Sequence, residues 1–319
     1  MSALAIVLAM YLQPAASSAY GTARPLECGL ADGFKAANPW ERAKEPNLRR
    51  YCDLLASGTA KLVGAGSAVL VKEVPGIADE ADKLLPGRAS PSVLKGRAYL
   101  RMNQPAEALK ALEDAKKRDD RALDDPVALL AWARANAKTG RLAEAAAAYR
   151  AALPRTSALS AQERSAAAFE AGMTVMMQKG GIDDAVAMFR QARKDAQDSL
   201  QVASMVALAL ALDRSGQKEE AKAALADRVH ADVKSFLVGD PRVREALGDA
   251  GASDETDALL GYALEGLDPA GSREAWRKYL EGPGGKGPWA DHAREHAGAA
   301  PAKAPVKPAT KPAPTRGTR

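Results

Sequence analysis

Apolar positions along this chain are filled mostly by Ala and Leu, and few of them carry Ile, Phe or Tyr. Ala and Leu lose little side-chain freedom in a helix, which makes them the best helix formers. Strands favour β-branched and aromatic residues, yet no run of the sequence alternates such residues with polar ones. The pattern therefore predicts an all-α protein.

The pattern also repeats at a nearly fixed interval. Four segments share a Gly or Asn before a turn and then an acidic residue followed by Ala. These acid–Ala pairs are Glu107-Ala108, Glu144-Ala145, Asp184-Ala185 and Glu220-Ala221. From Ala to Ala the steps are 37, 40 and 36 residues. Such a period indicates a repeat architecture, in which each unit buries its apolar face against its neighbours.

In the second copy, large apolar residues and small residues recur three or four positions apart on both sides of a glycine. They are Leu129, Trp132, Ala133 and Asn136 before it, Gly140 itself, and Ala145, Tyr149 and Ala152 after it. This pattern resembles the tetratricopeptide repeat, a unit of ~34 residues built from two helices. The resemblance implies a right-handed superhelical α-solenoid of antiparallel helix pairs.

The other copies match in part, and together they set the expected boundaries. In the first copy Asn103 replaces the turn glycine, and Asn is the next most tolerant residue of a left-handed conformation. We expect a tetratricopeptide-like repeat domain over residues 89–299. Its repeats would cover about 89–125, 126–161, 166–200, 202–229 and 254–283, with a closing helix at 288–298. Residues 230–251 would add one short helix and a loop between the fourth and fifth repeats.

The start of the chain indicates export. It is an uncharged apolar run followed by small residues, and Ser17 and Ala19 suit the −3 and −1 positions of a signal-peptidase site. We therefore predict a signal peptide at residues 1–19 and a periplasmic or secreted bacterial protein. Because no Lys or Arg precedes the run, a short hydrophobic N-terminal helix is the alternative. The run is too short to span a bilayer, which needs ~20 apolar residues.

Residues 20–88 fall outside the repeat pattern, and we expect an N-terminal helical cap there. Two helices fit, at about 47–63 and 65–85, with Pro75 and the glycine after it kinking or breaking the second. The chain has two cysteines. In an oxidising compartment Cys28 and Cys52 would form a disulfide that fixes the cap. Two free buried thiols are the alternative.

The net charge of +5 comes from the C-terminal end. After Glu295 the chain carries five basic residues and no acid, which accounts for the whole excess. The basic balance therefore does not argue for a nucleic-acid-binding fold. Residues 300–319 are Ala, Pro, Lys and Thr with hardly any large apolar residue, so we predict a disordered tail. It would either solubilise the protein or make weak contact with the cell wall or a membrane surface.

One motif matches known catalytic chemistry. Residues His292 to His296 read H-x-x-E-H, the inverted zinc-protease motif. On a helix both histidines share a face and could ligate one zinc ion, with Glu295 as general base. Such a site needs a third protein ligand, which in that family is an acid downstream, and no acid follows Glu295. We therefore interpret the motif as a chance match, and predict no enzyme, no metal and no cofactor.

In the tetratricopeptide family the first helices of the repeats line a concave groove. The resemblance places six polar residues there as candidates for binding a partner: Arg97, Arg101, Arg134, Lys138, Gln178 and Arg214. The basic members would hold an acidic or C-terminal carboxylate peptide through charge-assisted bonds, and a solvated groove without a peptide is the alternative.

The sequence thus predicts a non-enzymatic scaffold or adaptor of the periplasm or cell envelope. It would bind partner proteins of an envelope complex through the repeat groove. The alternative function is a module that binds the cell wall or another acidic polymer with its basic tail.

Overall fold

The structure, a computed structural model, describes residue 28 and residues 39–63, 68–226 and 233–298. Over these ranges the chain is helical and contains no strand, which confirms the all-α prediction. The predicted signal peptide at 1–19 and the predicted tail at 300–319 lie outside the described residues. Of the helices in the described part, none is long and apolar enough to cross a membrane.

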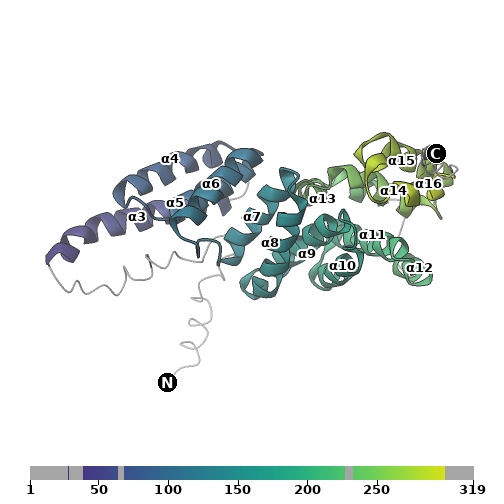
Figure 1. Cartoon of the computed structure of the whole chain (residues 1–319), viewed down its shortest axis with the longest axis horizontal. Helices are drawn as coiled ribbons and strands as arrows, with labels where there is room; N and C mark the ends of the chain where they lie inside the picture. The colour runs from purple at the N-terminus through teal and green to yellow at the C-terminus, as the bar shows by residue number, and fades with distance from the viewer. Residues whose placement is uncertain (1–27, 29–38, 64–67, 227–232, 299–319) are drawn as a thin grey trace, which may run out of the picture.

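Consecutive helices pack as antiparallel pairs and stack along one long axis (Figure 1). The pairs are α3 (Pro39–Val63) with α4 (Ala68–Leu84), α5 (Ser90–Arg101) with α6 (Pro105–Arg118), α7 (Pro126–Lys138) with α8 (Leu142–Ala152), α9 (Ala161–Met176) with α10 (Ile182–Asp195), α11 (Asp198–Arg214) with α12 (Lys218–Ala226), and α14 (Thr256–Leu264) with α15 (Pro269–Glu281). A last helix, α16 (Ala290–His296), packs on α15. This arrangement is the helical solenoid that the repeat pattern predicts.

Short helical segments connect these pairs. They are η1 (Leu153–Ala158), η2 (Ser235–Gly239), η3 (Ser253–Glu255) and η4 (Pro283–Lys286). Between η2 and η3 lies one further α-helix, α13 (Pro241–Asp249). This helix is not a member of any pair, and it packs against α7, α9 and α11.

The turns inside the repeats have the backbone that their residues favour. Asn103 has φ 55° and Gly140 has φ 78°, both in the left-handed region. In each turn the amide of the next residue donates to a carbonyl five residues back, from Gln104 to Tyr99 and from Arg141 to Asn136. These bonds satisfy helix-end carbonyls that otherwise lack a partner. Asn103 therefore takes the place of the turn glycine, as the sequence predicts.

Small residues let the two helices of a repeat approach closely, and large ones fill the space beside them. Gly261 on α14 is one example, because a Cβ atom there would lie 2.9 Å from the ring of Trp276 on α15. Trp276, Tyr149 and Phe189 are fully buried. One continuous core runs from α7 to α16. Two smaller cores fill the space between α5, α6 and α7 and the space under α3, α4 and α5.

The first helix before the repeats starts earlier than predicted, and of the two outcomes predicted at Pro75, a kink or a break, the break does not occur. Helix α3 begins at Pro39, eight residues before the expected start. Helix α4 runs through Pro75 without a break. Proline removes one backbone donor, but Val74 and Ala78 on either side of it are fully buried, and this packing holds the helix together.

The predicted disulfide between Cys28 and Cys52 is present, and it joins the segment before α3 to that helix. Both residues are buried in the same core as Tyr51. Leu94 and Ala98 of α5 belong to this core too, so it is continuous with the first repeat.

Candidate functional site

The first helices of the repeats, α5, α7, α9 and α11, form the face called the inner surface below, and the chain itself covers part of it. Helix α13 lies on α7, α9 and α11, and its side chains Val243 and Leu247 are buried. Asp240 caps the helix by accepting a hydrogen bond from the amide of Arg242 at 2.7 Å. Just past the helix, Gly251 has φ 65°, and a Cβ atom there would lie 2.4 Å from a carbonyl oxygen of α7. The backbone of this segment therefore touches the backbone of the second repeat.

The end of α13 presents an acidic side chain to two of the predicted groove residues. Asp249 lies 2.8 Å from Nζ of Lys138 and 3.5 Å from Nε of Arg134. The residue after it, Ala250, accepts a hydrogen bond from the hydroxyl of Thr174 on α9 at 3.0 Å. The C-terminal end of a helix carries partial negative charge, so cations are favourable there. Charge and hydrogen bonding thus fix α13 on the inner surface.

Arg134, which contacts Asp249, also belongs to a buried network of charged and polar side chains. Arg134 binds Glu170 of α9 in bidentate fashion, with N–O distances of 2.8 and 2.9 Å. The hydroxyl of Tyr149 donates to the same carboxylate at 3.2 Å. Burial raises the pKa of Glu170, and the charge of Arg134 opposes that effect. Burial and the nearby carboxylate raise the pKa of Tyr149 well above its ordinary value.

The remaining predicted groove residues have different surroundings. Arg101 makes a more exposed ion pair with Glu245 of α13 at 3.3 Å, and Arg97 lies one turn earlier on α5, half-buried. Gln178 donates to the carbonyl of Leu142 at 2.7 Å, which ties the third repeat to the second. That bond makes Gln178 part of the packing between repeats.

Arg214 is fully buried at the far end of the array. It pairs with Glu255 of η3 at 2.9 Å and lies over the ring of Trp289, 5.1 Å from its centroid. Arg101, Arg134, Lys138 and Arg214 therefore pair with acids. Of these acids, Glu245, Asp249 and Glu255 come from residues 233–255. Glu245 and Asp249 lie between the predicted fourth and fifth repeats, whereas Glu255 lies within the predicted fifth repeat, and their negative charge was the available signal.

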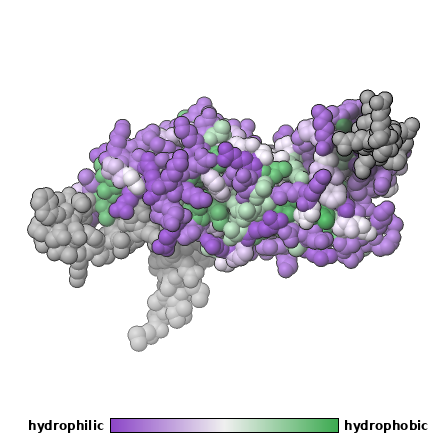
Figure 2. Space-filling model, viewed as in Figure 1, coloured by the Kyte–Doolittle hydropathy of each residue, from purple (hydrophilic) through white to green (hydrophobic). Residues whose placement is uncertain are grey.

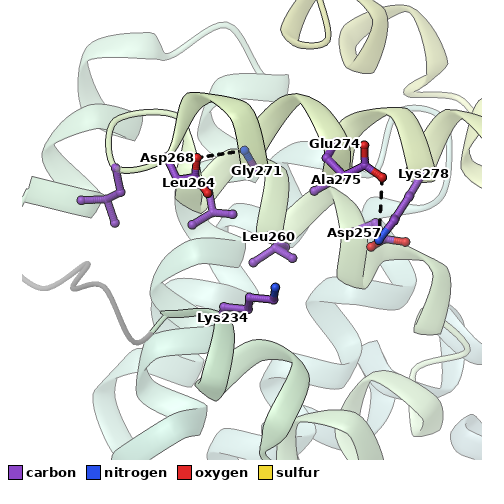
Figure 3. Close-up of a pocket in the computed structure, with 10 residues that line it drawn as sticks. Lys234, Asp257, Leu260, Leu264, Asp268, Gly271, Glu274, Ala275 and Lys278 are labelled. Atoms are coloured by element: carbon purple, nitrogen blue, oxygen red, sulfur yellow. Dashed lines mark hydrogen bonds and ion pairs between the residues drawn. The ribbon is translucent and has the colours of Figure 1, made fainter.

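An open hollow of about 370 Å³ lies between Lys234 and helices α14 and α15 (Figure 3). Leu260 and Leu264 form its apolar floor, and charged side chains stand around it. Two of these, Glu274 and Lys278, pair with each other along α15 at 4.0 Å. Cations and anions mix on the rim, so the hollow does not select a ligand of one charge.

A cluster of one aspartate and two histidines joins the H-x-x-E-H motif to α11. Oδ2 of Asp213 lies 2.7 Å from Nε2 of His292 and 2.9 Å from Nε2 of His296. Burial acts to raise the pKa of Asp213, but hydrogen bonds with both rings hold it well below its ordinary value. Burial lowers the pKa of His296, and its bonds with Asp213 and Glu265 outweigh this and raise it to about 9. The third ligand expected for the protease motif is an acid downstream of it, whereas Asp213 lies upstream and only the fold brings it near.

The face of the molecule seen in Figure 2 is largely polar. Figure 2 shows hydrophilic side chains over most of the visible face, with apolar side chains gathered in its middle over α7, α8 and α9. This mixture is typical of a water-facing surface, since folded proteins keep much apolar area exposed.

Comparison with known proteins supports the repeat architecture. Residues 91–121 match the family model of the tetratricopeptide repeat. This segment covers most of α5, all of α6 and the turn at Asn103 between them. No curated protein matches the chain. A relationship to the tetratricopeptide family is therefore supported, and repeats of this kind suggest a scaffold for protein–protein interaction.

Proposed function

We propose that this protein is a non-enzymatic scaffold whose inner surface binds an acidic segment of a partner protein. The observation that carries the proposal is the solenoid of helix pairs with a tetratricopeptide repeat at residues 91–121. Repeats of this class present an extended concave surface to other chains.

The contacts of α13 support an acidic partner. The inner surface already accepts two acidic side chains, Glu245 and Asp249, on cations of α5 and α7. Arginine and lysine bind carboxylates through short charge-assisted hydrogen bonds. A partner segment with the same charge would use the same chemistry.

The first repeat is the part of the inner surface proposed to receive the partner. Helix α13 packs on α7, α9 and α11, farther along the array. On α5 the pair of Arg101 and Glu245 is about half exposed, with side chains 48% and 61% accessible. Exposed pairs contribute about 0–1 kcal/mol, so a partner can replace this contact at little cost. Arg97 and Arg101 are four residues apart and share one face of α5.

We further propose that the protein works in the periplasm or outside the cell, on proteins of an envelope complex. The disulfide Cys28–Cys52 supports an oxidising compartment, because structural disulfides are rare in the reducing cytosol. Alkylation of cysteines in protein taken directly from cells should leave both unmodified until a reductant is added. Full modification without reductant would refute this location.

Site-specific photocrosslinking in intact cells tests the scaffold proposal. A photoreactive residue at Arg101 should capture one discrete partner, whereas the same residue at Lys110 should capture none. Lys110 is the matched control, because it is exposed on α6, the second helix of the same repeat. Equal patterns of crosslinking at both positions would contradict binding at the inner surface.

A further inference from the structure

The cluster that joins α16 to α11 brings three metal-binding side chains to one point. Asp213 is the second-last residue of α11, and His292 and His296 lie one turn apart on α16. Their ligand atoms all lie within 4.8 Å of one another, and the two Nε2 atoms are 3.2 Å apart. All three side chains are largely buried, at 7%, 14% and 19% exposure.

The spacing of these atoms suits a tetrahedral zinc ion. Zinc binds His nitrogen and carboxylate oxygen at about 2.0–2.2 Å, which puts ligand atoms about 3.3 Å apart in a tetrahedron. The three separations here are 2.7, 2.9 and 3.2 Å. Small rotations of the side chains would open this triangle enough to accept the ion.

The surroundings hold the ring of His296 as a metal site requires, whereas Nδ1 of His292 is buried without a hydrogen-bond partner among the described residues. Nδ1 of His296 bonds to Glu265 of the α14–α15 turn, and the indole of Trp276 donates to the same carboxylate at 3.2 Å. The indole also stacks on His296, with ring centroids 5.1 Å apart. A carboxylate on the far nitrogen of a ligating histidine fixes the ring and raises its basicity.

The local charge favours a divalent cation. Asp213 and Glu265 place two carboxylates around the pair of rings. The nearest arginine in sequence, Arg214, is buried and directed to Glu255 at 2.9 Å. The ion would displace the proton that His296 holds between Asp213 and Glu265, and with both rings neutral it would balance the two carboxylates.

We propose that Asp213, His292 and His296 bind one Zn²⁺ ion through Oδ2, Nε2 and Nε2, with water in the fourth position. The ion is structural. It fastens the closing helix α16 to α11 and so holds the C-terminal end of the array together. Glu295, the general base of the protease motif, is an exposed residue, and no proteolytic role is included. The proposal does not depend on binding of a partner protein.

Zinc titration of the full chain, without a histidine tag and after removal of metals by a chelator, tests this site. Calorimetry should show one Zn²⁺ per chain, and zinc should raise the midpoint of thermal unfolding. D213N and H292N should each lower the affinity at least 100-fold and abolish the rise. E295Q is the matched control within the same motif and should bind as the unaltered chain does.

Two further measurements test the zinc site even if a variant of a ligand residue fails to fold. E265Q removes no ligand and should weaken zinc binding about 10- to 100-fold. Co²⁺ bound in place of zinc should give the intense visible absorption of a tetrahedral site. Absence of stoichiometric zinc in the unaltered chain would overturn the proposal and leave the cluster as a hydrogen-bonded charge network. Unchanged affinity in D213N and H292N would overturn it too.

Discussion

Arg134 of the second repeat clasps Glu170 of the third in a bidentate ion pair, and the two side chains are only 12% and 3% exposed. Removing one partner of such a pair leaves an uncompensated buried charge, which costs about 3–5 kcal/mol. Glu170→Ala should lower the free energy of unfolding by up to that amount in urea titrations, because Asp249 still lies 3.5 Å from Nε of Arg134.

The matched control is Asp184→Ala. Asp184 also pairs with an arginine of the preceding repeat, Arg150, but those side chains are 56% and 44% exposed. Exposed pairs contribute about 0–1 kcal/mol. If Glu170→Ala and Asp184→Ala lowered the free energy of unfolding equally, burial would not explain the contribution of the Arg134–Glu170 pair to stability.

Asp249 should fix α13 on the inner surface more strongly than Glu245 does. Asp249 contacts Lys138 and Arg134 in a largely buried place, whereas the pair of Glu245 with Arg101 is exposed. Asp249→Ala should speed amide hydrogen exchange across residues 241–249, and Glu245→Ala should leave it nearly unchanged. A faster exchange in both variants alike would contradict the distinction.

Asp240 should make stability depend on pH below about 4. Burial acts to raise its pKa, but hydrogen bonds with Ser199 and Arg242 lower it from 3.8 to about 2. A carboxyl whose pKa is lower in the folded state stabilises it above its ordinary pKa, and that stabilisation is lost as the pH falls through the folded value.

Asp240→Asn keeps a capping side chain and removes the charge. At pH 7 it should cost about 0.3–1 kcal/mol, the usual size of a charge–helix interaction. The difference between the two proteins in urea titrations should shrink as the pH falls from about 4 towards 2. A difference that stays constant over this range would contradict the account.

Substitution of two glycines by alanine distinguishes a steric effect from an effect of helix propensity. Gly261→Ala would drive a methyl group into Trp276 and should destabilise the protein by about 1–3 kcal/mol. Gly76 lies inside α4 with nothing within 4 Å of a new Cβ atom. Gly76→Ala should therefore stabilise the protein by about 0.5–1 kcal/mol, because Ala is the better helix former. Thermal unfolding of both variants checks the pair, and a shift of the same sign would contradict it.

The fold could be predicted from the sequence because its determinants are local. The spacing of Ala145, Tyr149 and Ala152 follows one helix face, and Asn103 and Gly140 are residues that a left-handed turn favours. The Cys28–Cys52 disulfide was expected because the chain has two cysteines and its start was interpreted as an export signal. Each of these features depends on residues close together in the chain or on composition.

The surroundings of the candidate site could not be predicted in the same way. Lys138 and Asp249 are 111 residues apart, and His292 and Asp213 are 79 apart. The repeat pattern says nothing of where a segment outside it will lie, so the position of α13 on the inner surface had no local signal. The groove residues Arg134, Lys138 and Arg214 were expected to face a partner, but their burial and their pairing with the chain's own acids had no signal in the repeat pattern.

The most direct test of the scaffold is the affinity of the inner surface for the protein segment captured by crosslinking at Arg101. Fluorescence anisotropy with that labelled segment should give an affinity at least 10-fold weaker for Arg101→Glu than for the unaltered chain. Lys110→Glu, which makes the same charge change on α6, should bind as the unaltered chain does. Equal affinity in all three proteins would contradict the claim that this surface holds the partner.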